Sequence, residues 1–323
     1  MSKAIMVRAH GGADVLKLED RDLDAPGPGE IAVRNHAIGL NFIDVYFRTG
    51  LYPAQLPFVP GNEGAGEVIA IGEGVTEFKP GDRVAYNGPI GAYAQERLMP
   101  ADRAVPLPEG IDYESAAAVM LKGLTAYYLL HMTWQLKPGE TILFHAAAGG
   151  VGLIACQWAK ALGARVIGTA GSDEKVELAL RNGCDHAINY SRENFVERVR
   201  DITNGAGVDV VYDSVGKDTF EDSLDCLRKR GLMVSFGNST GPVSIPDLGI
   251  LARKGSLFVT RPTIFGYLAE RADLLMAARA LFKAIGDGRI MVQIGQRYPL
   301  ADAAEAHRAL EGRKTVGSTI LVP

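Results

Sequence analysis

The sequence predicts an α/β protein in two parts, a β-rich domain and a doubly wound parallel sheet with helices on both faces. The chain has 323 residues, which is enough for two domains of about 100–200 residues each. Short strand-like runs separated by glycine and proline fill the part before Tyr113. From Thr141 onward, strand-like and helical stretches alternate, which is typical of a parallel sheet with crossover helices.

The β-rich part contains five runs with the composition of strands. They are KAIMVRAH (3–10), VLKLEDRD (15–22), EIAVRNHAIGL (30–40), GAGEVIAIG (64–72) and DRVAYNG (82–88). The segments APGPGE, FVPGNEG and FKPGD between them supply turn residues. Many short strands joined by such turns predict a barrel or a sandwich. The run STILV (318–322) is short and apolar, and we expect it to return to the same sheet.

The alternating part follows an alanine-rich helix that we expect within residues 113–132. We expect strands at Thr141–His145, Arg165–Thr169, His186–Ile188, Val208–Asp213, Leu232–Phe236 and Ser256–Thr260. Helices are expected at Asp173–Arg181, Asn194–Ile202 and Thr219–Arg230, and a further long helix at about Leu268–Ile285. Six strands separated by helices predict a parallel sheet of the Rossmann type.

The segment FHAAAGGVG (144–152) is a candidate dinucleotide-binding turn between the first strand and its helix. Aligning Ala147, Gly149 and Gly152 gives A-x-G-x-x-G, in which alanine replaces the first glycine. Gly149 would let the backbone approach a pyrophosphate, and Gly152 would let the helix pack closely on the strand. We expect Ala147 to be tolerated in an ordinary backbone region. A turn without ligand is the alternative, but the six-strand context favours a cofactor.

The end of the second strand indicates which cofactor binds. The stretch GTAGS (168–172) is neutral, whereas an NAD site usually has a carboxylate there for the ribose hydroxyls. Ser172 and Lys175 favour a 2′-phosphate, so NADPH is the expected cofactor. Asp173 and Glu174 come too late to bind the ribose and are interpreted as acids of the first helical turn. Lys175 could alternatively belong to a solvated helix surface.

We expect no metal site. The segment PGNEGAGEV (60–68) has Asn62 where a Gly-His-Glu zinc segment would have its histidine, and Asn41 lies in the preceding segment. His131 and His145 are single histidines in apolar contexts, which indicates packed or hydrogen-bonded side chains. Hydride transfer without a metal needs an acceptor that delocalises charge onto oxygen, such as a quinone or a conjugated carbonyl.

Composition and charge argue against several other classes. The net charge of −4 gives no general attraction for nucleic acid or an anionic membrane. No run approaches the roughly 20 apolar residues of a membrane span, and the start MSKAIMVRAHGG has no signal-peptide core. The three cysteines, Cys156, Cys184 and Cys226, form no CxxC pair, so we expect neither a disulfide framework nor a structural zinc lobe. The expected location is the cytoplasm.

Eight segments carry a family resemblance: NFIDVYFRTGLYP (41–53), PGNEGAGEV (60–68), KPGDRVAY (79–86), LKGLTAYYLL (121–130), LFHAAAGGVGLIACQWAKALGA (143–164), VVYDSVG (210–216), GLMVSFGNSTGPV (231–243) and VTRPTIFGY (259–267). Together they resemble the zinc-free, zeta-crystallin-like quinone oxidoreductases of the medium-chain dehydrogenase/reductase superfamily, over essentially the whole chain. The resemblance implies a GroES-like catalytic domain (1–122 plus 262–323) and an inserted Rossmann NADP-binding domain (123–261). It also implies a homodimer and NADPH in the cleft between the domains.

The resemblance also implies roles for individual residues. Asn41, Tyr46 and Tyr52 would position the substrate, and Asn41 and Tyr46 would also approach the nicotinamide. The other cofactor contacts would come from Thr125, Gly149, Gly150, Val151, Ser172, Lys175, Tyr190, Ser214, Phe236, Gly237, Asn238, Phe265 and Arg313. Tyr52 could instead be a packing aromatic, and Arg313 could be a cation at a helix end.

Three functions stay open. The leading one is NADPH-dependent, zinc-independent reduction of small quinones, and the second is reduction of an activated C=C bond in enals or enones. The third is an RNA-binding or structural, crystallin-like role, which no RNA-binding motif or basic tract supports. We expect no dedicated acid of strongly shifted pKa, because water can protonate a hydroquinone anion and Asp44 could face solvent or substrate.

Overall fold

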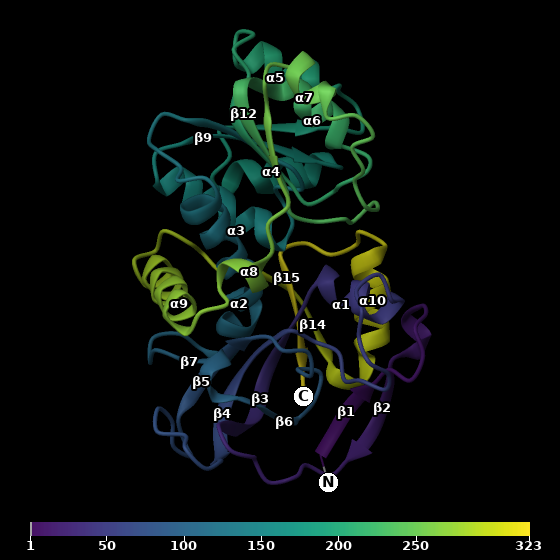
Figure 1. Cartoon of the computed structure of the whole chain (residues 1–323), viewed down its shortest axis with the longest axis vertical. Helices are drawn as coiled ribbons and strands as arrows, with labels where there is room; N and C mark the ends of the chain where they lie inside the picture. The colour runs from purple at the N-terminus through teal and green to yellow at the C-terminus, as the bar shows by residue number, and fades with distance from the viewer. Residues whose placement is uncertain (1) are drawn as a thin grey trace. The chain divides into compact units, whose positions relative to one another are not determined.

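The computed structural model describes residues 2–323, which divide into two compact units. Unit 1 comprises Met1–Leu124, Glu270–Gly286 and Val292–Pro323, and unit 2 comprises Thr125–Ala269 and Asp287–Met291. In Figure 1, unit 2 has the teal and green colours of the middle of the chain, and unit 1 has the purple, blue and yellow of its two ends. Unit 1 is therefore assembled from separate segments of the sequence.

Unit 1 contains a β1–β2 hairpin and a seven-stranded sheet. The sheet has the order β14-β15-β3-β4-β5-β7, and β6 also pairs with β3. The strands are β1 (Ser2–Met6), β2 (Lys17–Arg21), β3 (Glu30–Leu40), β4 (Glu63–Ile71), β5 (Arg83–Asn87), β6 (Glu96–Pro100), β7 (Ala104–Pro106), β14 (Ile294–Pro299) and β15 (Ser318–Val322). The helices are η1 (Ala13–Val15), α1 (Phe42–Thr49), η2 (Ala101–Arg103), α2 (Tyr113–Tyr127), α9 (Arg271–Gly286), η4 (Leu300–Asp302) and α10 (Ala303–Glu311).

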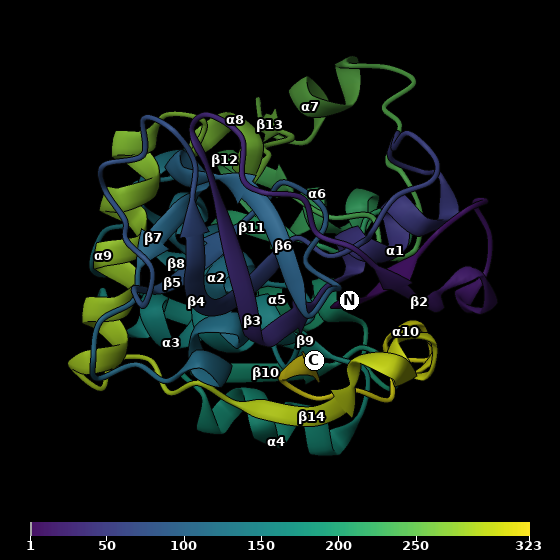
Figure 2. The ribbon, with the colours of Figure 1, turned by 90° about the horizontal axis from the view of Figure 1, so that it is seen from below.

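Strand β3 is the centre of this sheet. Its apolar residues, such as Ile31, Val33 and Ile38, belong to the hydrophobic core of unit 1. β15 runs antiparallel to β3, with Thr319 opposite Leu40, which confirms that the closing strand returns to the first sheet. Strand β14 forms one edge of this sheet, and η4 and α10 follow it along the chain. Figure 2 shows β14 and α10 in yellow.

Unit 2 is a six-stranded sheet with the order β10-β9-β8-β11-β12-β13, in which every pair is parallel. The strands are β8 (Thr141–Phe144), β9 (Arg165–Ala170), β10 (His186–Asn189), β11 (Val208–Asp213), β12 (Leu227–Ser235) and β13 (Phe258–Thr260). The helices are the π-helix η3 (Tyr128–Thr133), α3 (Gly150–Ala161), α4 (Asp173–Arg181), α5 (Phe195–Ile202), α6 (Phe220–Cys226), α7 (Gly249–Arg253) and α8 (Ile264–Tyr267). The order confirms the predicted Rossmann sheet.

Both faces of the unit 2 sheet are buried. Leu143, Ile167 and Val211 point into a cluster with apolar residues of α5 and α6. The adjacent residues Ile142 and Val166, which alternate to the opposite face, are also fully buried. Because both faces are covered, the strands are near-continuous apolar runs, which made them predictable. None of the helices that the structure describes within residues 2–323 has the length and apolarity that a membrane crossing requires.

The predicted helix Thr219–Arg230 is wrong in its last four residues. Helix α6 ends at Cys226, and residues 227–235 form β12, which begins five residues before the predicted Leu232. Leu227 pairs with Val208 of β11, and the Arg228 guanidinium forms an ion pair with Asp209 at 2.6 Å. These contacts with the neighbouring strand outweigh the local helical pattern.

Two other helices depart from the sequence prediction. The expected helix Leu268–Ile285 begins only at Arg271, because Leu268 ends the short helix α8. The Arg271 guanidinium fixes this start by donating to the carbonyl oxygen of Asp102 at 2.8 Å. Helix α1 had no prediction. The structure places it directly after β3, with Asn41 as its N-cap residue.

Candidate active site

The predicted cofactor turn joins β8 to α3, at the position in the sheet where the strand order reverses. Gly149 precedes α3 with φ −81° and ψ 173°, and its N–H donates to the Ala146 carbonyl at 2.8 Å. The positive φ of this turn, 54°, belongs to Ala146 and not to Ala147, as expected for a tolerated Ala147. Gly150 and Val151 begin α3. N–H groups of a first helical turn lack partners within the helix, so this end can bind a phosphate.

The two fingerprint glycines meet different constraints. A β-carbon at Gly152 would collide with the carbonyl oxygens of Ala146 and Ala147, the latter at 2.6 Å. A β-carbon at Gly149 would lie 3.1 Å from the Ala146 oxygen, which is tight but not prohibitive. The fold itself therefore requires glycine at 152. A strict requirement at 149 would have to come from a ligand.

The end of β9 is neutral and brings several predicted residues together. The Ser172 hydroxyl caps α4 by accepting the Lys175 backbone N–H at 3.4 Å. A β-carbon at Gly171 would lie 2.6 Å from the Tyr190 hydroxyl, so the Tyr190 ring lies beside this turn. Tyr190 is 41% exposed, which leaves its face accessible to a ligand. Ser172, Lys175 and Tyr190 thus surround one turn without a carboxylate at the strand end, which fits a 2′-phosphate.

Asp173, the acid nearest to this turn, is bound elsewhere. Its carboxylate accepts from the Asn189 amide at 2.6 Å and pairs with Arg192 at 2.6 Å. Asp173 and Glu174 lie in the first turn of α4, which confirms that they are helix acids. The ribose carboxylate of an NAD site therefore has no counterpart at the end of β9.

The ends of β11 and β12 bring a second predicted group together. The Phe236 N–H donates to the Asp213 carbonyl at 2.8 Å. A β-carbon at Gly237 would lie 2.8 Å from Cα of Ser214, so these two backbones are in contact. With the Asn238 amide oriented so that its oxygen accepts from the Arg261 guanidinium at 3.1 Å, its nitrogen donates to the Gly237 carbonyl at 2.9 Å. Ser214, Phe236, Gly237 and Asn238 thus line the carboxyl ends of adjacent parallel strands, where open α/β sheets bind ligands.

The Asp213 side chain organises this edge and was not among the predicted residues. It is fully buried, and its Oδ1 accepts the N–H groups of Val215 at 2.7 Å and Gly216 at 3.2 Å. Its Oδ2 accepts the Thr219 hydroxyl at 2.9 Å. An acid at the last position of a buried apolar strand is the sequence signal that could have identified it.

In unit 1, Asn41 lies between β3 and α1 and has two carboxylate partners. Its side-chain Nδ2 donates to Glu63 Oε1 at 2.7 Å, and its backbone N–H donates to Asp44 Oδ2 at 2.9 Å. The second contact is one half of a capping box, since Asp44 is the third residue of α1. Asn41 is 7% exposed. Its orientation is therefore set by hydrogen bonds within the protein.

Asp44 faces neither solvent nor a substrate surface, because it is fully buried. Burial raises the pKa of the Asp44 carboxyl to about 7, above its ordinary 3.8, although Asn62, Asn41 and Tyr93 all donate hydrogen bonds to it. This segment therefore holds an acid of shifted pKa, but Asp44 lies away from the surface, so the expectation that the reaction uses no dedicated acid stays a prediction. The cause of the shifted pKa is desolvation by surrounding elements, which a local sequence window does not contain.

Tyr46 and Tyr52 form an aromatic group at the end of α1. Their ring centroids are 5.2 Å apart, and the Tyr52 N–H donates to the Tyr46 carbonyl at 3.1 Å. Phe42 lies 6.4 Å from Tyr46, and Phe47 lies 5.7 Å from Tyr52 in an edge-to-face arrangement. Both tyrosines remain partly exposed. The structure thus brings these two predicted residues together.

The remaining predicted residues lie in separate elements. Thr125 is a buried residue near the end of α2. Phe265 lies on α8 and is 48% exposed. Arg313 follows α10 and adopts a left-handed conformation with φ 56°.

The histidines behave as the sequence suggests. His145 is buried, with Nδ1 2.9 Å from the Thr169 hydroxyl and Nε2 2.9 Å from the Ser223 hydroxyl, and burial lowers its pKa. The His131 ring lies 4.8 Å from the Tyr127 ring, and burial lowers its pKa as well. Among residues 2–323, no group of three or more His, Cys, Asp or Glu side chains could hold a metal ion.

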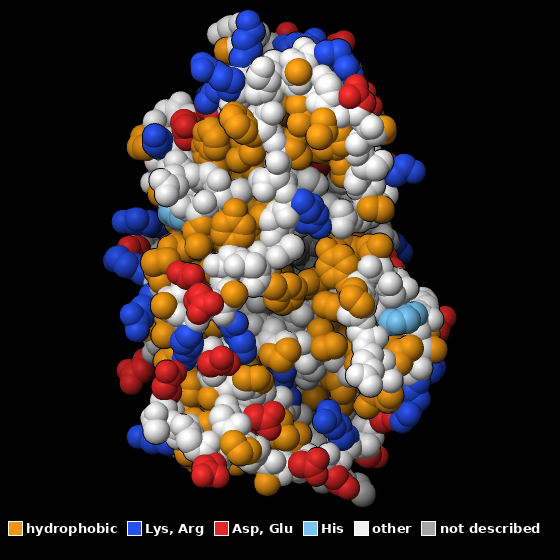
Figure 3. All heavy atoms as spheres, in the orientation of Figure 1, with side chains coloured by type: hydrophobic (Ala, Val, Ile, Leu, Met, Phe, Trp, Pro, Cys, Tyr) orange, Lys and Arg blue, Asp and Glu red, His pale blue; other side chains and the backbone are white. Residues whose placement is uncertain are grey.

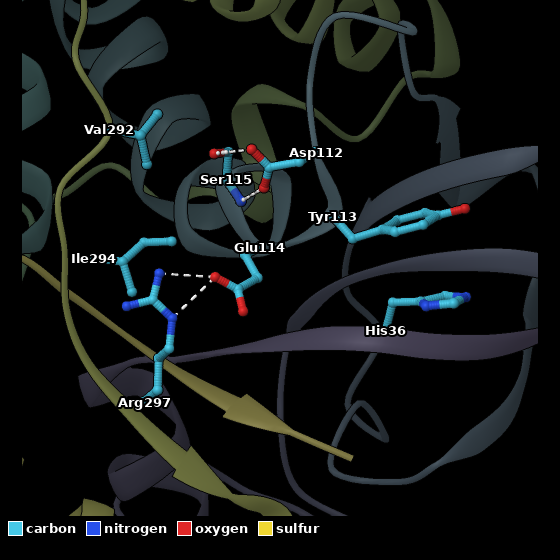
Figure 4. A pocket seen from close by; sticks show the side chains of 8 residues that line it. All are labelled: His36, Asp112, Tyr113, Glu114, Ser115, Val292, Ile294 and Arg297. Atoms are coloured by element: carbon cyan, nitrogen blue, oxygen red, sulfur yellow. Dashed lines mark hydrogen bonds and ion pairs between the residues drawn. The ribbon is translucent and has the colours of Figure 1, made fainter.

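A surface pocket of about 670 Å³ in unit 1 contains none of the predicted site residues (Figure 4). Its polar groups already have partners within the pocket. Arg297 forms a double ion pair with Glu114 at 2.8 and 2.9 Å, and the Asp112 carboxylate accepts the Ser115 hydroxyl and N–H. The candidate site is therefore defined by the groups of predicted residues described above, and this pocket is not part of it.

Charges on the surface are mixed in sign. On the face drawn in Figure 3, basic side chains in blue and acidic side chains in red are interspersed. That face forms no extended basic surface of the kind that binds a nucleic acid backbone.

Comparison with protein families matches two parts of the chain. Residues 27–109 match the family described as "Alcohol dehydrogenase GroES-like domain", and residues 150–279 match the family described as "Zinc-binding dehydrogenase". The first match lies within unit 1. The second match begins at Gly150, directly after the turn, and includes α3, the neutral end of β9 and the strand ends described above.

Individual relatives match over the full length. The chain is 57% identical over 325 residues to a quinone oxidoreductase of Pseudomonas aeruginosa, with 100% of both chains covered. It is 45% identical over 334 residues to a 2-haloacrylate reductase of Burkholderia sp, with 100% of this chain and 99% of the relative covered. The solved structure of Escherichia coli quinone oxidoreductase complexed with NADPH is similar with a TM-score of 0.98 and 53% identity, covering 99% of this chain and 100% of that one.

Proposed function

Because the chain belongs to the quinone oxidoreductase family of the medium-chain dehydrogenase/reductase superfamily, we propose that it is an NADPH-dependent reductase of small quinones. The observation that carries this proposal is the neutral end of β9 beside the start of α3. The relative from Escherichia coli was solved as a complex with NADPH, and the same chemistry suits the residues of this chain. Bound NADPH would supply a hydride to the quinone carbon.

The residues of unit 2 would bind the cofactor. Gly149, Gly150 and Val151 would bind the pyrophosphate with the start of α3. Ser172, Lys175 and Tyr190 would bind the 2′-phosphate, and the Lys175 ammonium would supply the charge. The remaining contacts are assigned to Thr125, Ser214, Phe236, Gly237, Asn238, Phe265 and Arg313. A phosphate-binding lysine with no competing carboxylate at the strand end supports a preference for NADPH over NADH.

The residues of unit 1 would position the quinone. Asn41 is held by two carboxylates, so it can offer hydrogen bonds at a fixed place. The Tyr46 and Tyr52 hydroxyls would donate to a quinone oxygen, and their rings would provide a flat apolar surface. A quinone delocalises the negative charge that it receives, so water can complete the protonation. Position and hydrogen bonding are then the main contributions of the protein.

We infer that this reaction needs no zinc. Asn41 and Asn62 stand where a zinc site of this family would need stronger donors, and both amides donate hydrogen bonds to buried carboxylates. Zinc sites are built mainly from Cys, His, Asp and Glu side chains, and a neutral amide oxygen is a weaker ligand than any of these.

A second candidate is reduction of an activated C=C bond. The relative at 45% identity carries the name 2-haloacrylate reductase, and an electron-poor alkene accepts hydride by the same route as a quinone. The product of that reaction is a more basic carbanion, which depends more on a positioned proton donor. Substrate preference therefore separates the two candidates.

We propose that the protein is a cytoplasmic homodimer. Strand β13 ends the unit 2 sheet, and Phe258 on this strand is 59% exposed. An apolar residue on the final strand of a sheet favours pairing with a second copy. All three cysteines are buried free thiols, which suits a reducing compartment. Light scattering of wild-type protein and of Phe258→Lys tests the dimer, which the lysine should weaken.

The decisive experiment is a steady-state assay of the purified protein with small quinones, enones and 2-haloacrylates, each with NADPH and with NADH. The proposal expects the highest kcat/KM for a quinone with NADPH, unchanged after dialysis against a chelator. Elemental analysis of the same sample gives the zinc content. A preference for an alkene supports the second candidate, and loss of turnover with the zinc contradicts metal independence.

A further inference from the structure

Glu63 is a fully buried carboxylate, and three donors hold it in place. Its Oε1 accepts from Asn41 Nδ2 at 2.7 Å and from the Lys122 ammonium at 2.5 Å. Its Oε2 accepts the Leu121 N–H at 2.5 Å. Lys122 is only 5% exposed, so the two charges compensate one another away from solvent. Asn41 is thus bound to a group that is itself fixed.

The backbone leaves the Glu63 carboxylate little room to move. A β-carbon at Gly39 would overlap both the Glu63 carboxylate and the Ala117 carbonyl oxygen. Glycine on β3 therefore makes the space in which this carboxylate reaches Asn41. Because Nδ2 donates to Glu63, the amide of Asn41 cannot exchange its oxygen and nitrogen ends without breaking a bond to a buried charge.

Asp44 holds Asn41 from the backbone side and is supported by a hydrogen-bond chain. The Tyr93 hydroxyl lies 3.1 Å from Asp44 Oδ2 and 3.1 Å from His307 Nε2. Arg48 lies 3.1 Å from His307 Nδ1 and can only donate, so the histidine proton is on Nε2 and faces Tyr93. The Tyr93 proton must then point to Asp44. Arg48 itself pairs with Glu311 through two bonds, at 2.8 and 2.9 Å.

We propose that Glu63 and Asp44 are positioning residues of the reaction, because together they hold Asn41 in one orientation toward the substrate. We call the set of Asn41, Glu63, Lys122 and Asp44 the Asn41 clamp. The proposal rests on the proposed function, in which Asn41 contacts the substrate. Glu63 and Asp44 act only through Asn41, since both are fully buried.

The test is a cycle of variants built on Asn41. Glu63→Gln combined with Lys122→Met removes both buried charges together, which avoids leaving one charge without its partner. We expect this double variant to lower kcat for a quinone by about 10-fold while the KM for NADPH changes less than about twofold. Asn41→Ala should cause a similar loss. Adding the double substitution to Asn41→Ala should then cause no further loss, because the residues act through one side chain.

A control and a second variant make the cycle specific. Tyr86→Phe removes another buried hydrogen bond of unit 1, from the Tyr86 hydroxyl to Asn35 at 2.7 Å, and should leave kcat unchanged. Glu63→Asp keeps the charge beside Lys122 but withdraws the carboxylate from Asn41. It should reproduce the loss of kcat, and it replaces the double variant if that protein does not fold. If the loss of kcat in the combined variant equals the product of the losses caused by Asn41→Ala and by the double substitution, the proposal is overturned.

A measurement without turnover separates this proposal from the proposed function. The Asn41 side-chain amide, assigned by comparison with Asn41→Ala, should show slow hydrogen exchange in NMR spectra of the wild-type protein. It should exchange faster in Glu63→Asp. Fast exchange in wild type overturns the clamp whether or not a quinone is reduced. Absence of NADPH-dependent quinone reduction beside a protected amide rejects the proposed function, and with it the catalytic role of the clamp.

Discussion

The Tyr93 hydroxyl lies 3.1 Å from His307 Nε2, and the two rings meet edge to face at 84°. Both residues are fully buried. Burial, together with the neighbouring Arg48, lowers the pKa of His307 to about 3. On the other side of Tyr93, burial raises the pKa of Asp44 to about 7. Two groups bound to one hydroxyl therefore couple folding to pH in opposite directions.

Asp44→Asn should change how stability depends on pH between about 4 and 7. In that range the folded protein holds a proton on Asp44 that the unfolded chain, with an ordinary pKa of 3.8, has lost. The free energy of unfolding then falls as pH rises, by up to about 1.4 kcal/mol per pH unit. Denaturant unfolding at several pH values should show the variant gaining stability relative to wild type as pH rises. If the free energies of unfolding of variant and wild type changed in parallel with pH, the raised pKa of Asp44 would be contradicted.

His307→Gln should have the opposite effect. Between about pH 3 and 6.5, the unfolded chain protonates His307 while the folded protein keeps it neutral. This histidine therefore makes the protein lose stability as pH falls through that range, by up to about 1.4 kcal/mol per pH unit. The variant should be less sensitive to acid than wild type in the same unfolding series. An unchanged acid slope would show that His307 is not held neutral.

The two fingerprint glycines should separate stability from cofactor binding. Gly152→Ala places a β-carbon against two carbonyl oxygens and should lower the free energy of unfolding by about 1–3 kcal/mol. Gly149→Ala should fold nearly as well as wild type but bind NADPH more weakly, because its β-carbon would face the bound pyrophosphate. Thermal unfolding and NADPH titration measure the two effects. Equal NADPH affinity in Gly149→Ala and wild type would refute the placement of the pyrophosphate.

Lys175→Ala should raise the KM for NADPH by about 10-fold and leave the KM for NADH nearly unchanged, because only NADPH carries the 2′-phosphate. Initial rates with each cofactor measure the difference. Lys160→Ala is the control, since Lys160 of α3 pairs with Asp185 and should affect neither cofactor. An equal effect of Lys175→Ala on both cofactors would place this lysine on the solvated helix surface.

Tyr46→Phe should lower quinone turnover by about 10-fold, the size of one lost neutral hydrogen bond. The phenyl ring would keep the packing with Tyr52 at 5.2 Å. Initial rates with one quinone and one enone measure the loss, and Tyr52→Phe tests whether Tyr52 only packs. A loss of about 10⁴-fold would make Tyr46 an essential general acid and favour the C=C reductase.

The elements with local signals could be predicted from the sequence. Strands β3 and β11 and helix α4 have the predicted bounds, because each has its own periodicity and turn residues. The error at Leu227–Arg230 has a nonlocal cause. These residues become a strand because β11 lies beside them and Asp209 pairs with Arg228. A window along the sequence contains neither contact.

The residues of the candidate site also fall into those with a local sequence pattern and those that only the fold brings together. The glycine turn and the neutral end of β9 are short patterns, so their residues could be proposed from the sequence alone. Three residues of the site come from separate elements: Glu63 from β4, Lys122 from α2 and His307 from α10. No local sequence motif distinguishes any of them from an ordinary polar residue. Their role depends on the folded arrangement around Asn41 and Asp44. Burial, which gives these charges their effect, is a property of that arrangement.

The pairing of β15 with β3 also affects the order of events during translation. Leu40 leaves the ribosome long before Thr319, its partner across the sheet, so unit 1 cannot complete its sheet while most of the chain is being made. Unit 2 is almost one continuous stretch and can fold as soon as β13 has emerged. In the meantime residues 38–40 of β3 lack the partner that β15 will later supply, whereas residues 30–34 can already pair with β6. A nascent chain of this protein therefore leaves this short end of β3 unpaired for most of its synthesis, and chaperones would have the longest time to bind it there.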